Sequence, residues 1–224
     1  MELFKKVAII APHPDDEILG CGGMIKRLTK IGCEVHILFV SGHLPPLYKE
    51  KDFEITYNES LKALKLIGVE KKNITFLKIP ATYIHDTPIS VLNGKIERFI
   101  HTSKAQTVFS CFPDRHIDHR IIFDATMVAT RPNNANSPKM VFLYETLSET
   151  HWNVGNVEPN FVPNFYIDIS ETINNKLEAL MCYKSQIKGN LSRSKKAVKA
   201  LAEFRGTQNG TFFAEAFQLV RGIY

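Results

Sequence analysis

The sequence predicts an α/β fold built on a mainly parallel β-sheet. Short apolar runs rich in β-forming residues alternate along the chain with longer segments in which apolar residues recur at helical spacing, which is the pattern of βαβ units. The chain has 224 residues, with no internal repeat and no linker, and this length suits one well-buried core. We therefore expect a single domain over residues 1–224.

The expected strands and helices alternate from the N-terminus. Apolar positions such as Leu61, Leu64 and Ile67 recur with the period of a helix. Gly32 and Gly68 each follow a helical segment and are placed as its C-terminal stop. Strands are expected at about 5–11, 34–41, 73–78, 106–112, 139–144 and 164–169. Helices are expected at about 17–31, 52–67, 88–102, 117–130, 170–184 and 193–205.

The composition is that of an ordinary globular chain, with 44% hydrophobic and 23% charged residues. We find no secretory signal pattern and no apolar run of the roughly 18–20 residues that a membrane span requires. We therefore expect a cytoplasmic protein without an integral membrane segment, while a peripheral visit to a membrane stays open. The cysteines form no Cys-x-x-Cys pair, which indicates neither a thiolate zinc site nor a disulfide framework. They are Cys21, Cys33, Cys111 and Cys182.

The formal net charge is +5, and much of the excess lies near the C-terminus. A solvated helix face explains this basic run best, and contact with an anionic substrate or lipid headgroup is the alternative. No aromatic residues are interleaved with the basic ones, so we expect no nucleic-acid partner. The run comprises Lys188, Arg193, Lys195, Lys196 and Lys199.

The most informative segment is residues 11–17, which directly follow the first expected strand and contain His13, Asp15, Asp16 and Glu17. Exits of buried strands are where α/β folds place active groups. One imidazole nitrogen of His13 and one carboxylate oxygen of Asp16 make two-thirds of a catalytic zinc site, which takes three protein ligands and a water. Asp15 would lie beside that water and accept its proton as a general base.

A third ligand is expected from the other histidine-dense segment, residues 112–120, which follows the strand expected at 106–112. Carboxyl ends of parallel strands share one edge of a sheet, so the two segments can converge. We assign His119 to the metal. His116 lies near it and could protonate a leaving group or stabilise an oxyanion. Asp118 is the expected orienting partner for a histidine.

Each segment also has a simpler explanation. Asp16 or Glu17 could merely cap the following helix and complement its dipole. Similarly, His116 and His119 could line an exposed helix start. The two segments together favour metal binding, because both follow expected strands and jointly complete the ligand count.

These residues resemble the two motifs of the PIG-L/LmbE-like family of zinc-dependent N-acetylglucosaminyl deacetylases. The family's Ala-His-Pro-Asp-Asp-Glu is similar to residues 12–17 here, and its His-Pro-Asp-His is similar to residues 116–119, where Ile117 replaces the proline. The resemblance extends over nearly the whole chain. It includes Gly22-Gly23, the helix from Asn58-Glu59 to Val69, the sequence Tyr183-Lys184-Ser185-Gln186, and an ending with Arg205-Gly206 and Phe213–Phe217.

The resemblance implies a Rossmann-like three-layer fold that holds Zn2+ through His13, Asp16 and His119. It further implies Asp15 as the base and His116 as the acid or electrophilic partner. Fe2+ can occupy similar nitrogen and oxygen ligands. The expected reaction removes an N-acetyl group from an amino-sugar conjugate, which could be a nucleotide sugar, a glycolipid or a small-molecule glycoside, and releases acetate. Hydrolysis of a different sugar-linked amide, or a catalytically idle sugar- or nucleotide-binding module, are the alternatives.

Departures from the family pattern concern the substrate. Thr56 stands where the family often has Arg, and residues 40–43 read Val-Ser-Gly-His instead of Thr-x-Gly-Glu. Both changes lie where familiar members contact the sugar or its appended group. The sequence leaves open whether the chain forms a homo-oligomer. Expected substrate contacts are His43, Tyr57, Glu145 and Trp152, although a Trp in such a segment is more often a loop anchor than a sugar platform.

Overall fold

Seven strands form one sheet in the computed structural model, which describes residues 2–133 and 135–223. The strands are β1 (Lys6–Ala11), β2 (Glu34–Gly42), β3 (Ile74–Pro80), β4 (Thr107–Cys111), β5 (Met140–Tyr144), β6 (Phe165–Asp168) and β7 (Ala214–Gly222). Their order in the sheet is β3-β2-β1-β4-β5-β7-β6. The pairs from β3 to β5 are parallel, and β7 is antiparallel to both of its neighbours. The expected mainly parallel sheet is confirmed.

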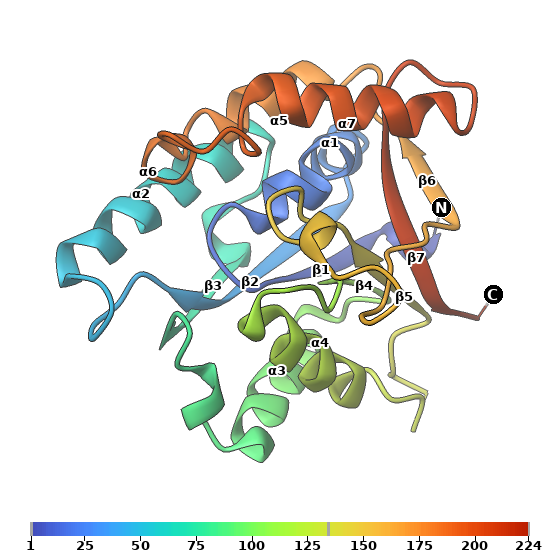
Figure 1. Cartoon of the computed structure of the whole chain (residues 1–224). Helices are drawn as coiled ribbons and strands as arrows, with labels where there is room; N and C mark the ends of the chain where they lie inside the picture. The colour runs from blue at the N-terminus through green and yellow to red at the C-terminus, as the bar shows by residue number, and fades with distance from the viewer. Residues whose placement is uncertain (1, 134, 224) are drawn as a thin grey trace.

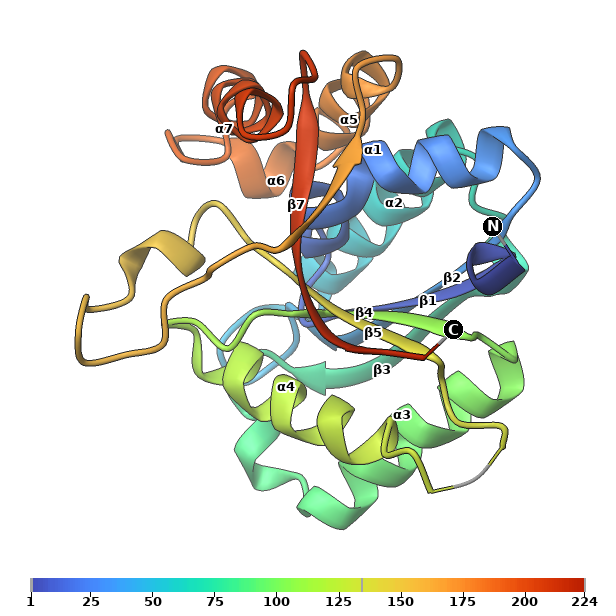
Figure 2. The same ribbon diagram turned by 90° about the vertical axis from the view of Figure 1, so that its right-hand side faces the viewer.

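Helices cover both faces of the sheet. The α-helices are α1 (Asp16–Lys30), α2 (Glu50–Leu66), α3 (Ile89–Ser103), α4 (Ile117–Ala129), α5 (Ile173–Leu180), α6 (Lys184–Ile187) and α7 (Lys195–Thr207). Short 3-10 helices are η1 (Glu2–Phe4), η2 (Lys71–Asn73), η3 (Ile84–Asp86) and η4 (Thr150–Trp152). Figures 1 and 2 show α3 and α4 on one side of the sheet and the other α-helices on the opposite side. The expected three-layer α/β fold is therefore confirmed.

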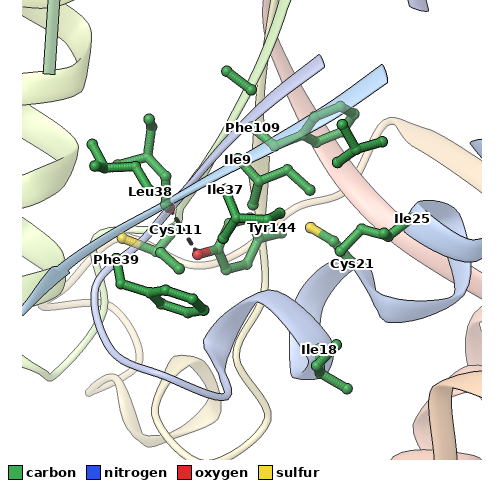
Figure 3. Close-up of a cluster of buried hydrophobic side chains, with 14 of the residues drawn as sticks. Ile9, Ile18, Cys21, Ile25, Ile37, Leu38, Phe39, Phe109, Cys111 and Tyr144 are labelled. Atoms are coloured by element: carbon green, nitrogen blue, oxygen red, sulfur yellow. Dashed lines mark hydrogen bonds between the residues drawn. The ribbon is translucent and has the colours of Figure 1, made fainter. Parts of the chain in front are cut away.

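The central strands are buried on both faces. Residues 7–11 of β1 are fully buried, as expected for a parallel strand between two helical layers. Tyr144 lies in the core between the sheet and α1 (Figure 3), and its hydroxyl donates a hydrogen bond of 2.9 Å to the carbonyl of Ile10. A Cβ on Gly20 of α1 would lie 2.2 Å from Cδ2 of the Tyr144 ring. Glycine at this position therefore lets α1 lie against the core directly behind the first motif.

Two predicted helix ends are confirmed. Gly32 and Gly68 follow α1 and α2 with φ values of +83° and +91°, which glycine adopts without steric cost. The helix expected at 170–184 is wrong in detail, because the structure has α5 and a separate single turn, α6. Among the described residues, no helix combines the length and apolarity needed to cross a bilayer.

The C-terminal strand β7 is absent from the predicted elements. Its first four residues are buried, but Glu215 is a charged residue among them and interrupts the apolar run. The Glu215 carboxylate accepts hydrogen bonds from the backbone N of Gly23 and of Met24 at 2.8 and 2.7 Å. It also accepts from Nζ of Lys176 at 2.6 Å. These long-range partners compensate the buried charge, and none of them can be read from the local pattern.

Candidate active site

The first motif forms the turn between β1 and α1. Asp15 precedes α1 with φ 115° and ψ −25°, a conformation that costs a residue with a side chain about 1–3 kcal/mol. The carboxylates of Asp16 and Glu17 bind backbone amides of this turn. Oδ2 of Asp16 accepts from N of His13 at 2.9 Å, and Oε2 of Glu17 accepts from N of Asp15 at 3.0 Å. Local backbone binding therefore accounts for Glu17 and partly for Asp16, but not for the carboxylate of Asp15.

The second motif forms the turn between β4 and α4. His116 is the N-cap of α4, and its Nδ1 accepts a hydrogen bond of 3.2 Å from N of Asp118. β1 and β4 are parallel neighbours with Ile10 opposite Ser110, so their carboxyl ends lie side by side. The two motifs meet at this edge of the sheet.

His13, Asp16 and His119 approach one another around a single carboxylate oxygen. Oδ2 of Asp16 lies 3.3 Å from Nδ1 of His13 and 3.4 Å from Nε2 of His119. Two ligand atoms bound tetrahedrally to one zinc ion at about 2.0–2.2 Å are about 3.3–3.6 Å apart. The spacing therefore fits a shared metal ion. The imidazoles of His13, His116 and His119 also form a group whose ligand nitrogens lie within 4.8 Å of one another.

The environment of His119 supports a ligand role. Its ring is buried, and its Nδ1 lies 2.9 Å from Oδ1 of Asp114. Asp114 is held in turn by Oγ1 of Thr150, which donates to its Oδ2 at 2.9 Å. On the other side of the ring, Nε2 has no hydrogen-bond partner among the described residues. A buried nitrogen without a partner, on a ring fixed by a carboxylate, is the arrangement typical of metal-binding histidines.

Asp118 orients His13. Its Oδ2 lies 2.9 Å from Nε2 of His13 and accepts a hydrogen bond of 2.8 Å from the backbone N of Thr82. Thr82 has a φ of 66°, an uncommon conformation for a β-branched residue. This arrangement leaves Nδ1 of His13 directed at Asp16.

Opposite charges stabilise the protonated histidines and the ionised Asp16. Burial alone would lower the pKa of His13, but hydrogen bonds to Asp118 and Asp16 outweigh it and raise the pKa to about 9. Burial likewise opposes the protonated form of His119, and the charge of Asp16 and the bond to Asp114 raise its pKa to about 10. For Asp16, burial favours the neutral form, yet the two histidines hold its pKa well below the usual value. A bound cation would replace these protons.

Asp15 is buried and paired with Arg193. Burial raises the pKa of Asp15 to about 7, with the positive charge of Arg193 opposing the shift. Nη1 of Arg193 lies 2.8 Å from Oδ2 of Asp15, and Nε donates to Oγ of Ser148 at 3.1 Å. The pKa of His116 changes in the other direction, because burial and the charge of His13 lower it to about 4. Asp15 therefore titrates near neutral pH, and the His116 ring is neutral there.

The solvated-face interpretation of the basic run is wrong for Arg193. The side chain of Arg193 precedes α7 and is 17% exposed because it reaches into the site. The interpretation is confirmed for Lys195, Lys196 and Lys199, which are exposed on α7, whereas Lys188 is exposed but follows α6.

His43 lies next to the site. Its buried Nδ1 has no hydrogen-bond partner in the described part of the chain. Burial and the positive charges of His13 and Arg193 lower its pKa to about 4. The ring packs edge-on against Tyr48, with centroids 4.4 Å apart. It lines a cavity of about 360 Å3 together with Tyr48, Asp52, Ile55, Thr56, Ser185 and Gln186.

The other expected substrate contacts lie apart from this cavity. Tyr57 packs against Phe76, with ring centroids 4.9 Å apart, and lines a separate surface hollow. Glu145 is buried and forms two hydrogen bonds of 2.8 and 2.6 Å with Arg205. Trp152 is 63% exposed in η4, within the segment that projects beyond the carboxyl ends of the strands in Figure 2. The structure therefore brings only His43 of these four to the cavity.

Sequence reasoning missed Asp114, Arg193 and the contact between Glu17 and Tyr183, in which the hydroxyl donates to Oε1 at 2.5 Å. Asp114 carried a signal, because it is a carboxylate five residues before His119 in the same turn. Arg193 carried none, since 178 residues separate it from Asp15.

Similarity to known proteins agrees with this geometry. Residues 8–130 match the family described as PIG-L, GlcNAc-PI de-N-acetylase. A diacetylchitobiose deacetylase of Thermococcus kodakarensis is 28% identical, over 98% of this chain and 85% of the relative. A probable N-acetyl-α-D-glucosaminyl L-malate deacetylase 2 of Bacillus cereus is 22% identical, over 87% of this chain and 90% of the relative.

A solved structure has the same fold. The N,N'-diacetylchitobiose deacetylase of Pyrococcus horikoshii superposes with a TM-score of 0.77 and 24% identity, over 97% of this chain and 84% of that chain.

The region that matches the PIG-L family, residues 8–130, contains both motifs of the site and extends over more than half of the sequence. The chain belongs to the PIG-L family and is a deacetylase, a hydrolase that acts on amide bonds.

Proposed function

We propose that the protein is a zinc-dependent enzyme that removes the N-acetyl group from an amino-sugar conjugate and releases acetate. The observation that supports this most is the spacing of the facing atoms of His13, Asp16 and His119, which is that of metal ligands. The buried Asp15 lies in the same turn. The relatives are named for deacetylation of a chitobiose and of a glucosaminyl malate, which favours an amino-sugar substrate.

We assign the metal to Nδ1 of His13, Oδ2 of Asp16 and Nε2 of His119. Nitrogen and carboxylate donors suit Zn2+, and they also suit Fe2+. A divalent ion supplies Lewis acidity for the hydrolysis of an amide. Asp118 and Asp114 fix the rings of His13 and His119 and thereby present one nitrogen of each.

We assign proton transfer to Asp15. A general base works best when its pKa is near the working pH, and burial raises that of Asp15 to about 7. Its carboxylate would accept a proton from the attacking water and later return it to the departing nitrogen.

We assign stabilisation of the amide oxygen to His116. Because its Nδ1 accepts from N of Asp118, the neutral ring carries its proton on Nε2. A neutral ring with Nε2–H can donate a hydrogen bond to the negative charge that develops on the amide oxygen. This arrangement favours the electrophilic role over the acid role.

The test combines metal analysis with an acetate-release screen across nucleotide-linked, lipid-linked and free N-acetyl sugars. The purified protein should bind about one metal ion per chain and release acetate in a chelator-sensitive way. Asp15→Asn should keep the metal and lose at least about 100-fold in kcat. Asp124→Asn, at an exposed position on α4, is the matched control and should behave as the unaltered enzyme.

Three results would contradict the proposal in different ways. Undiminished turnover of Asp15→Asn would remove the base assignment. Release of an acyl group other than acetate would keep the site but change the substrate. Chelator-insensitive sugar binding without any turnover would favour a binding module.

A further inference from the structure

Arg193 contacts two segments of the site that are far apart in sequence. Nη1 contacts Oδ2 of Asp15 at 2.8 Å, and Nε donates to Oγ of Ser148 at 3.1 Å. Nη2 lies 3.8 Å from Oε1 of Glu149. The guanidinium thus lies between the turn after β1 and the segment after β5. The planar guanidinium donates to Asp15 and to Ser148 through separate nitrogens, whereas a lysine offers a single charged nitrogen.

The backbone around Arg193 is itself fixed. Oδ1 of Asn190 accepts hydrogen bonds from N of Ser192 at 3.1 Å, from Oγ of Ser192 at 2.6 Å and from N of Arg193 at 3.3 Å. Oγ of Ser194 caps α7 by accepting from N of Ala197 at 3.2 Å. The backbone at Arg193 is therefore held between a closed turn and a capped helix, which fixes the position from which its side chain extends.

The pairing selects one oxygen of Asp15. In the part of the chain that the structure describes, the hydrogen bond from Arg193 ends on Oδ2, and Asp15 is 1% exposed. A carboxylate held through one oxygen presents the other oxygen in a defined direction. General-base catalysis depends on such a direction, because the accepting atom must lie within hydrogen-bond reach of the proton that it takes.

We propose that Arg193 is a positioning residue of the deacetylase reaction, which binds Oδ2 of Asp15 so that Oδ1 is the oxygen that accepts the proton. This inference rests on the proposed function, since it acts through the general base. It concerns a residue that lies outside both sequence motifs and inside a run of exposed lysines.

The experiment compares Arg193→Gln, Arg193→Lys and Arg193→Ala in the metal-loaded enzyme. Lys195→Gln removes an exposed cation two residues away and is the matched control. Arg193→Gln should lower kcat by about tenfold or more and change KM by less than about twofold, because the base is misplaced but substrate binding is kept. Arg193→Lys should restore part of the loss, and guanidinium ions added to Arg193→Ala should restore kcat. Lys195→Gln should change nothing.

Readouts other than activity accompany the kinetics. Metal content of Arg193→Gln should match that of the unaltered enzyme, its Tm should fall because the buried Asp15 loses its partner charge, and its crystal structure should show the Asp15 carboxylate rotated from its position. An unchanged kcat, or a rise in KM alone, would overturn the proposal. A fall in kcat of Arg193→Ala that added guanidinium does not restore would show that Arg193 has only a structural role, and would also overturn the proposal. Failure of the unaltered enzyme to release acetate would instead contradict the proposed function.

Discussion

Oδ2 of Asp118 lies 2.9 Å from Nε2 of His13, and the opposite nitrogen of that ring faces Asp16. Asp118 therefore determines which His13 nitrogen is available to a metal. Asp118→Ala should weaken metal affinity by about 10–100-fold, as measured by competition with a chelator. Asp86→Ala, at an exposed position in η3, should leave the affinity unchanged. An unaltered affinity in Asp118→Ala would show that the contact does not orient the ligand.

Asp114 should likewise determine which nitrogen of His119 is available to a metal. Asp114→Asn keeps the shape of the side chain but weakens the contact with Nδ1 of His119, so it should lower metal affinity by about tenfold or more. Because Oγ1 of Thr150 donates to the same carboxylate, Thr150→Val should have a smaller effect in the same direction. Metal titration of both variants checks that Asp114→Asn loses more metal affinity than Thr150→Val. An equal or larger loss of affinity in Thr150→Val would contradict the prediction.

The metal-free protein should lose stability as the pH rises from 7 to 9. The pKa values of His13 and His119 are raised to about 9 and about 10, and that of Glu17 to about 8. The folded state therefore binds more protons than the unfolded chain in this range, so the free energy of unfolding falls with pH. Metal binding would displace the protons of His13 and His119 and should reverse the trend. Thermal unfolding with chelator and with Zn2+ checks both slopes, and a rising Tm in chelator would contradict the prediction.

Gly20→Ala should destabilise the protein. The added Cβ would overlap the buried ring of Tyr144, and overpacking of this kind costs about 1–3 kcal/mol. Gly94→Ala is the control, since nothing lies within 4 Å of its added Cβ inside α3, and it should stabilise the helix by about 0.5–1 kcal/mol. Urea unfolding of the two variants should move the midpoint in opposite directions. Equal midpoints would show that α1 can move away from the core.

Glu215→Gln should be costly although it lies outside the active site. The change leaves Nζ of Lys176 buried without its 2.6 Å partner charge, a loss that typically costs about 3–5 kcal/mol. The double variant Lys176→Met/Glu215→Gln should lose less free energy of unfolding than the two single variants lose in sum. Additive effects would contradict a coupled ion pair.

The sequence predicted the parts of the site that depend on local pattern. Both motifs follow strands, and the carboxyl ends of parallel strands share one edge of a sheet, so the sequence indicated that His13, Asp16 and His119 can converge. That β1 and β4 are neighbours is known from the structure. The helix stops at Gly32 and Gly68 were equally readable, because each requires a positive φ.

The remaining features depend on contacts between distant segments. The pairing of Arg193 with Asp15 joins residues 178 positions apart, and the exposed lysines beside Arg193 suggested a different environment. Glu145 lay at the expected strand end, yet its carboxylate is engaged by Arg205 from α7. β7 was missed because Glu215 resembles a surface residue until its partners in α1 and α5 are known.

The bonds between Glu215 and the amides of Gly23 and Met24 tie α1 to β7. The helix that starts at the first motif thus depends on a strand whose Glu215 lies 192 and 191 residues further along the chain than Gly23 and Met24. A nascent chain that carries both motifs but lacks β7 would hold α1 less firmly against the sheet. The order of synthesis therefore delays a fully formed site until the C-terminal strand has joined the sheet.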